Sequence, residues 1–119
     1  LCPGFNLVDR WPDIFGEQVF ERWEERGMRM VPDGSGTPTP LHWGFIEDAR
    51  MHPGEPENMH PTCIIHGRQD EVVPFAGSQQ YALLNDRVSL IATDDDHYLM
   101  KSLKPIEESV LSFFQLHQE

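Results

Sequence analysis

The chain has 119 residues, of which 39% are hydrophobic and 10% aromatic, a composition typical of one globular domain. Its formal net charge of −11 at pH 7 argues against binding to nucleic-acid phosphates or to anionic membrane surfaces. No signal peptide is visible, and no apolar run approaches the ~18 residues that a membrane-spanning helix needs.

Residues 1–6 are expected to form the end of a core strand that closes in a turn at Gly4. Because the chain opens on Leu1 with a strand already ending, we expect the sequence to be a fragment of a longer protein. Two cysteines, Cys2 and Cys63, are too few for a disulfide framework, and opposite ends of one parallel sheet would hold them too far apart to bridge. A reduced, cytoplasmic location is therefore expected.

Residues 7–60 are expected to form a cap-like region of helix and hairpin. A helix is predicted over residues 11–26, because apolar residues recur there at a spacing of four. The residues that define this stripe are Phe15, Val19 and Trp23. Gly27 is suited to end the helix.

A hairpin is predicted after this helix, because strong turn chemistry at residues 32–36 separates two short extended runs. These runs cover residues 28–31 and 39–43. A short helix is predicted at 44–51, and three prolines and a glycine mark residues 52–61 as an irregular connection.

Residues 61–119 are expected to form the core. Short apolar runs at 62–65 and 88–92 predict buried strands, and a helix is predicted between them from Pro74 to about Asn85. A final helix from Pro105 should pack on the sheet through its apolar face. Such alternation indicates the α/β class, with a parallel sheet and right-handed crossovers that bring the loops after both strands to one edge.

Two polar residues follow the two predicted strands at this edge. Asp70 follows the first strand and His97 follows the second. Because neighbouring strands lie about 4.8 Å apart, their loops can bring the carboxylate onto the imidazole. An aspartate that accepts from one ring nitrogen fixes the tautomer, so that the other nitrogen can act as a general base.

The segment His66-Gly-Arg-Gln-Asp70-Glu-Val-Val-Pro74, followed by Asp96-His97-Tyr98-Leu99 and a closing helix, resembles the carboxyl-terminal part of the α/β-hydrolases. The close resemblance covers residues 61–114. It implies that Asp70 is the acid and His97 the histidine of a Ser-Asp-His triad that cleaves an ester-like acyl bond of a small molecule, without a cofactor. It also implies parallel strands with crossover helices.

The nucleophile elbow G-x-S-x-G of that family is absent, because in the family's order it precedes the strand on which this chain opens. Gly34-Ser35-Gly36 is no substitute, since it sits in a turn of the predicted hairpin. This chain alone is therefore expected to be inactive. The alternative is a non-catalytic α/β-hydrolase-like module used for binding or scaffolding.

Other candidates compete for roles at the site. Glu71 is the rival of Asp70 as the acid, and His66 is expected to be structural. The run of aspartates before His97, together with His66, lacks recognisable metal-ligand spacing, so no metal site is predicted. Aromatic residues of the cap-like region could line an acyl pocket or simply pack against the core. They are Trp11 and Trp43, with Phe15 and Phe45.

Overall fold

The computed structural model describes residues 1–117 as two compact units. One unit contains Leu1–Phe5 and the chain from Glu55 onward, and the other contains Asn6–Gly54. Over the described residues the chain forms five helices, one parallel strand pair and one antiparallel strand pair, which is a mixed α/β structure. None of the helices in this part of the chain combines the length and apolarity that crossing a membrane requires.

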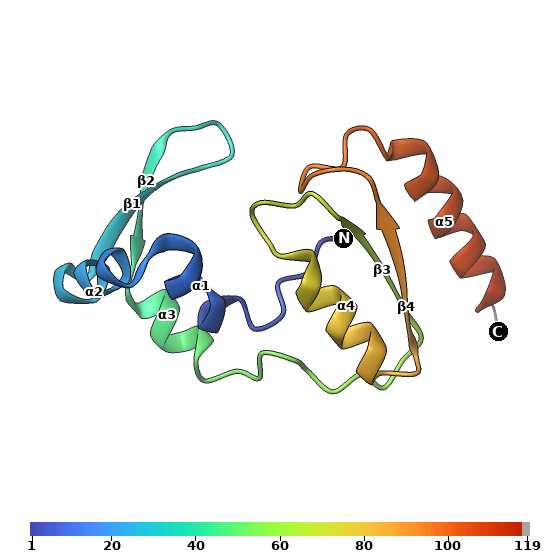
Figure 1. The fold of residues 1–119 in the computed structure, drawn as a ribbon, viewed down its shortest axis with the longest axis horizontal. Helices are drawn as coiled ribbons and strands as arrows, with labels where there is room; N and C mark the ends of the chain where they lie inside the picture. The colour runs from blue at the N-terminus through green and yellow to red at the C-terminus, as the bar shows by residue number, and fades with distance from the viewer. Residues whose placement is uncertain (118–119) are drawn as a thin grey trace. The chain divides into compact units, whose positions relative to one another are not determined.

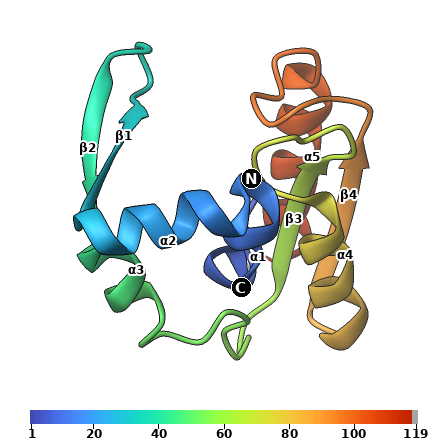
Figure 2. The same cartoon turned by 60° about the vertical axis from the view of Figure 1, so that its left-hand side comes forward.

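The first unit is built on the parallel strands β3 (Thr62–Gly67) and β4 (Val88–Thr93), joined by helix α4 (Phe75–Leu84) and seen side by side in Figures 1 and 2. The β-branched run Thr62-Cys63-Ile64-Ile65 favours the strand, and Pro74 stands at the helix N-cap. The predicted strand–helix–strand order is confirmed. Since the strands are parallel, the loops after both of them leave at the same edge.

Successive side chains of β3 point to opposite faces of this small sheet. Ile64 packs with Tyr81 of α4, together with Val88. On the other face, Cys63 and Ile65 line a concavity with residues of α5 (Leu103–Leu116). The two helices therefore cover different faces of the strand pair.

Helix α5 packs on the sheet less closely than the sequence predicts. Ile106 and Phe113 are half-buried, whereas Val110 and Phe114, on the predicted apolar face, are exposed, and no residue of the helix is fully buried. A pair of strands offers too narrow a surface to cover a helix of 14 residues.

The amino-terminal segment runs beside β3 near the carboxyl end of that strand. The backbone N–H of Cys2 donates to the carbonyl oxygen of Ile65 over 2.9 Å, and Cys2 is buried. Cys2 and Cys63 are both free thiols. One backbone bond does not define a strand, so the strand end expected at residues 1–6 stays a prediction.

The second unit contains α1 (Leu7–Phe15), α2 (Glu17–Arg26), α3 (Gly44–Ala49) and the hairpin β1–β2 (Met28–Pro32 and Pro38–His42). The predicted hairpin and short helix are confirmed. The unit encloses its own aromatic core, in which the indole N–H of Trp23 donates to the carbonyl of Leu41 over 2.9 Å. The buried residues of this core are Phe20, Trp23, Trp43 and Ile46.

The single helix predicted over residues 11–26 is wrong. The chain instead forms α1 and α2, which are separated at Gly16. This glycine has φ 92° and ψ 140°, a conformation that side chains rarely allow and that cannot continue a helix. The predicted stop at Gly27 is confirmed by its left-handed φ of 72° and by its N–H, which donates to the carbonyl of Trp23.

Candidate active site

The loops that follow β3 and β4 are tied to one another by backbone hydrogen bonds. The N–H of Arg68 donates to the carbonyl of Thr93 over 2.8 Å, and the N–H of Gln69 donates to the carbonyl of Asp95 over 3.1 Å. These bonds extend the strand pairing into the loops. They bring together the two segments that carry Asp70 and His97.

Gly67, the last residue of β3, permits this close approach. A Cβ atom at this position would lie 2.6 Å from the carbonyl oxygen of Asp96 and closer still to that of Asp95. Both obstacles are backbone atoms, which cannot turn aside as a flexible side chain could. The glycine after His66 is therefore required by contact with the second loop.

The structure brings Asp70 and His97 into direct contact. His97 Nδ1 lies 2.8 Å from Asp70 Oδ2, and the Asp70 carboxylate is fully buried. The other oxygen, Oδ1, accepts from the backbone N–H groups of Val72 and Val73, each over 2.8 Å. The contact is the one that the sequence predicts, and the rival Glu71 lies exposed beside it.

These hydrogen bonds keep Asp70 ionised. Burial acts to raise the pKa of the carboxyl, but the N–H of Val73, the His97 ring and the N–H of Val72 outweigh it and hold the pKa below its usual range. An ionised acceptor requires a proton on His97 Nδ1, so in the neutral ring the lone pair is on Nε2.

His97 is the part of this pair that solvent reaches. Its side chain is 30% exposed, and within residues 1–117 no protein group hydrogen-bonds to its Nε2 atom. The ring lines a concavity of about 370 Å³ at the edge where the strands end. The other residues that line it are Gln69, Glu71, Val72, Asp95, Asp96, Tyr98 and Lys101. A small substrate therefore has space beside the candidate base.

A second imidazole shares the same carboxylate but cannot serve an external substrate. His66 Nε2 lies 3.1 Å from Asp70 Oδ2 and 3.0 Å from the carbonyl of Val73, while His66 Nδ1 lies 2.6 Å from Ser78 Oγ. The group Ser78–His66–Asp70 has the composition of a triad, yet Ser78 and His66 are 0% exposed. These contacts fit a His66 ring whose proton is on Nε2, so that Nε2 donates and Nδ1 accepts from the Ser78 hydroxyl. This agrees with the structural role expected for His66.

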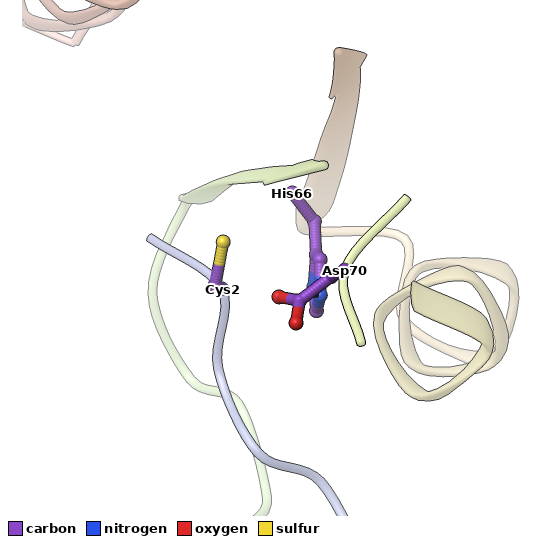
Figure 3. Close-up of side chains that lie close together, drawn as sticks. All are labelled: Cys2, His66 and Asp70. Carbon is purple, nitrogen blue, oxygen red and sulfur yellow. Dashed lines mark ion pairs between the residues drawn. The ribbon is translucent and has the colours of Figure 1, made fainter. Parts of the chain in front are cut away.

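Cys2 completes a cluster of ligand-type atoms with His66 and Asp70, shown in Figure 3; these atoms lie within 4.8 Å of one another. The atoms are already used: both His66 nitrogens and both Asp70 oxygens hydrogen-bond within the protein. Burial raises the pKa of the Cys2 thiol, and the charge of Asp70 acts in the same direction. A protonated thiol is a poor metal ligand and a poor nucleophile, so we assign the cluster a structural role.

Asp95 is a residue of the site that sequence reasoning missed. The sequence reads as a solvated run of aspartates, but Asp95 is only 3% exposed. Its carboxylate accepts from the N–H groups of Asp96 and Lys101 and from the hydroxyl of Ser102, over 2.8–2.9 Å. Burial opposes ionisation, and these bonds nevertheless hold the pKa of Asp95 below its usual range. Asp95 thus shapes the loop that presents His97.

Three further candidates lie in the second unit. Ser35 is in the hairpin turn, where its hydroxyl donates to Asp33 Oδ1 over 2.7 Å, so it has a local structural role. Trp43 is buried in the aromatic core of that unit, and Trp11 packs against the same core. Packing accounts for both indoles, and their role in substrate binding stays a prediction.

Comparisons of the chain with models of known protein families and with curated proteins found no match. The geometry of the site is therefore the basis on which a function can be proposed.

Replacing Gly67 by Ala tests the close approach of the two loops. The added methyl group would collide with the backbone of Asp95 and Asp96, so we expect Gly67→Ala to lower the free energy of unfolding by about 1–3 kcal/mol or more. Denaturant unfolding measures this. The matched control is Gly34→Ala, where the methyl group meets open space and the change should stay within about 0.5 kcal/mol. Equal effects of both substitutions would contradict the steric explanation.

Removal of the Ser78 hydroxyl tests the buried hydrogen-bond chain. We expect Ser78→Ala to cost about 1–3 kcal/mol of stability, because His66 Nδ1 would be left buried without a partner. Ser89→Ala, at an exposed position of β4, should change stability by less than about 0.5 kcal/mol. Thermal unfolding of the two variants side by side decides the point, and a neutral Ser78→Ala would show that the bond contributes nothing.

The lowered pKa of Asp70 predicts how stability depends on pH. Since the folded-state pKa lies below the unfolded value of ~3.9, the carboxylate contributes stability that is complete above that value and is lost as pH falls through the folded pKa. We expect Asp70→Asn to cost about 1–3 kcal/mol at pH 7 and the difference from wild type to shrink below about pH 4.

The control for this pH series is Asp94→Asn. Asp94 is 82% exposed and forms only a surface ion pair with Arg68, so its substitution should cost less than about 1 kcal/mol at any pH. Urea unfolding at several pH values measures both variants. A loss in Asp70→Asn that does not vary with pH would refute the assignment of an ionised, hydrogen-bonded carboxylate.

Proposed function

We propose that the unit built on β3 and β4 is the carboxyl-terminal part of an α/β-hydrolase, and that Asp70 and His97 are two members of a Ser-Asp-His triad. The reaction is hydrolysis of an ester-like acyl bond in a small molecule. The serine and the oxyanion hole would come from a segment that precedes this chain in a longer protein. The observation that carries the proposal is the 2.8 Å contact between Asp70 and His97.

The first support is that the two residues of the pair differ in exposure to solvent. Asp70 is buried and accepts three hydrogen bonds, whereas His97 is partly exposed and lines a concavity of about 370 Å³. An orienting carboxylate is expected to be fixed and ionised, and a general base is expected to be open to substrate. A pair with a purely structural role has no need of this difference in exposure.

The second support is the position of the pair in the fold. Both residues lie in loops that leave the same edge of a parallel strand pair, and such edges carry the ligand sites of open α/β sheets. The chain order of acid before histidine matches the order of the α/β-hydrolase triad.

In the proposed mechanism, Asp70 holds the Nδ1–H of His97 and stabilises the imidazolium when it forms. His97 Nε2 takes the proton of the serine hydroxyl as the serine oxygen bonds to the substrate carbonyl carbon. The same proton then passes to the leaving alcohol as the ester bond breaks. His97 next takes a proton from water, which attacks the acyl-serine, and returns it to the serine oxygen as the acid is released.

Hydrolysis of p-nitrophenyl esters by the longer protein tests this proposal. We expect His97→Ala and Asp70→Asn each to lower kcat on the order of 10⁴-fold, because the members of a triad act as a unit. The 119-residue chain alone should be inactive. Controls of the same residue types are His60→Ala and Asp94→Asn, both at exposed positions, which should change kcat less than about twofold.

A loss of only a fewfold in the His97 and Asp70 variants would remove the triad assignment. In that case the unit is better explained as a non-catalytic binding module. Rapid hydrolysis by the 119-residue chain would contradict the proposed source of the nucleophile.

A further inference from the structure

The second unit contains a concavity that the proposed hydrolase function does not use. It has a volume of about 420 Å³ and lies where the last turns of α2 meet β1. The volume falls within the range of about 300–1,000 Å³ that small-molecule sites occupy. The residues that line it are Val19, Arg22, Trp23, Arg26, Met28, Arg29 and Met30.

This concavity gathers positive charge in an acidic chain. The chain has nine Lys and Arg residues against a formal net charge of −11, yet three of the nine line this one concavity and no acidic residue lines it. Within residues 1–117, none of the three guanidinium groups forms an ion pair with a carboxylate. By contrast, Arg68 in the other unit pairs with Asp94 over 2.7 Å.

The fold itself brings the three arginines together. Arg22 and Arg26 are four residues apart on α2 and so lie on one face of the helix, where like charges repel by about 0.2–0.5 kcal/mol. The left-handed turn at Gly27 then returns the chain into β1, which adds Arg29. The guanidinium carbon of Arg29 lies 4.9 Å from the ring centroid of Phe15, a residue that does not itself line the concavity.

The remaining lining is apolar. Met28 and Met30 are 38% and 51% exposed, and the buried ring of Trp23 lies at the same site. Methionine side chains adapt to irregular aliphatic surfaces, and guanidinium groups bind carboxylates and phosphates through paired hydrogen bonds. The site thus offers cationic donors next to an apolar surface.

We propose that this concavity binds a small molecule with an anionic head group and an aliphatic body. The arginines hold the carboxylate or phosphate, and the aliphatic chain lies on the methionines and Val19. Binding places an anion beside the like-charged side chains of Arg22 and Arg26. The site lies wholly within residues 6–54, and the proposal does not depend on the hydrolase function.

Calorimetric titration of the 119-residue chain with decanoate at low ionic strength tests the proposal. Decanoate should bind, and acetate and decanol should each bind at least about tenfold more weakly, because each lacks one half of the ligand. Raising the salt concentration should weaken binding of decanoate. Decanol that binds as tightly as decanoate, or decanoate that does not bind, would overturn the proposal.

Matched arginine variants assign binding to this concavity. We expect Arg22→Gln and Arg26→Gln, both at exposed positions that should leave the fold intact, to weaken decanoate binding about three- to tenfold each. The triple variant with Arg29→Gln should show a loss greater than either. Arg10→Gln, the same substitution in α1 outside the concavity, should leave the affinity within about twofold. An equal loss in Arg10→Gln would place the binding elsewhere and overturn the assignment.

A final arm distinguishes a free ligand from a lipid surface. Vesicles of phosphatidylcholine with phosphatidylglycerol present anionic groups on a surface instead of a free aliphatic anion. We expect the chain to bind decanoate and to leave these vesicles unbound in a flotation assay. If the chain binds these vesicles and the arginine variants abolish that binding, the proposal of a small-molecule ligand is overturned.

Discussion

The buried carboxylate of Asp70 is the interaction on which the first unit depends. A buried negative charge is costly unless it is fully hydrogen-bonded. Here the two backbone N–H groups of its own loop donate to one oxygen and the His97 ring donates to the other, while His66 Nε2 lies 3.1 Å from that second oxygen. Because these bonds come from the loop after β3 and from the loop after β4, one side chain ties together two segments that the sequence separates.

The chemistry proposed for this edge depends on how closely the loop after β4 approaches the end of β3. Parallel pairing aligns Gly67 with Thr93, so both loops begin at the same level. The missing side chain at Gly67 lets the second loop cross directly over the end of β3. The buried Asp95 carboxylate stabilises that loop by accepting hydrogen bonds from Lys101 and Ser102, and His97 lies where solvent can reach it. Precise presentation of the imidazole thus depends on one absent side chain and one buried charge.

The features that the sequence predicts well are those with local causes. The apolar runs of β3 and β4, Pro74 at a helix start and the turn between β1 and β2 each leave a short-range signal, and the meeting of Asp70 with His97 follows from the strand order. The features it misses leave no periodic pattern in the sequence. Asp95 is buried and accepts from Ser102 and from two N–H groups of its own loop, and Gly16 breaks a helix that the apolar spacing alone would continue. Likewise, it is the folded hairpin that brings Arg22 and Arg26 of α2 to one concavity with residues of β1.

The buried histidine beside Asp70 has a consequence for which substitutions this protein can accept. The exposed ring of His97 is oriented by a carboxylate that also lies 3.1 Å from His66 Nε2, and His66 is in turn anchored to helix α4 through Ser78. Residues 66 and 78 therefore form a buried pair, in which a change at either position leaves a polar atom of the other without its partner. Related sequences should carry both residues or replace both together, so that position 78 of helix α4 would change only when position 66 changes.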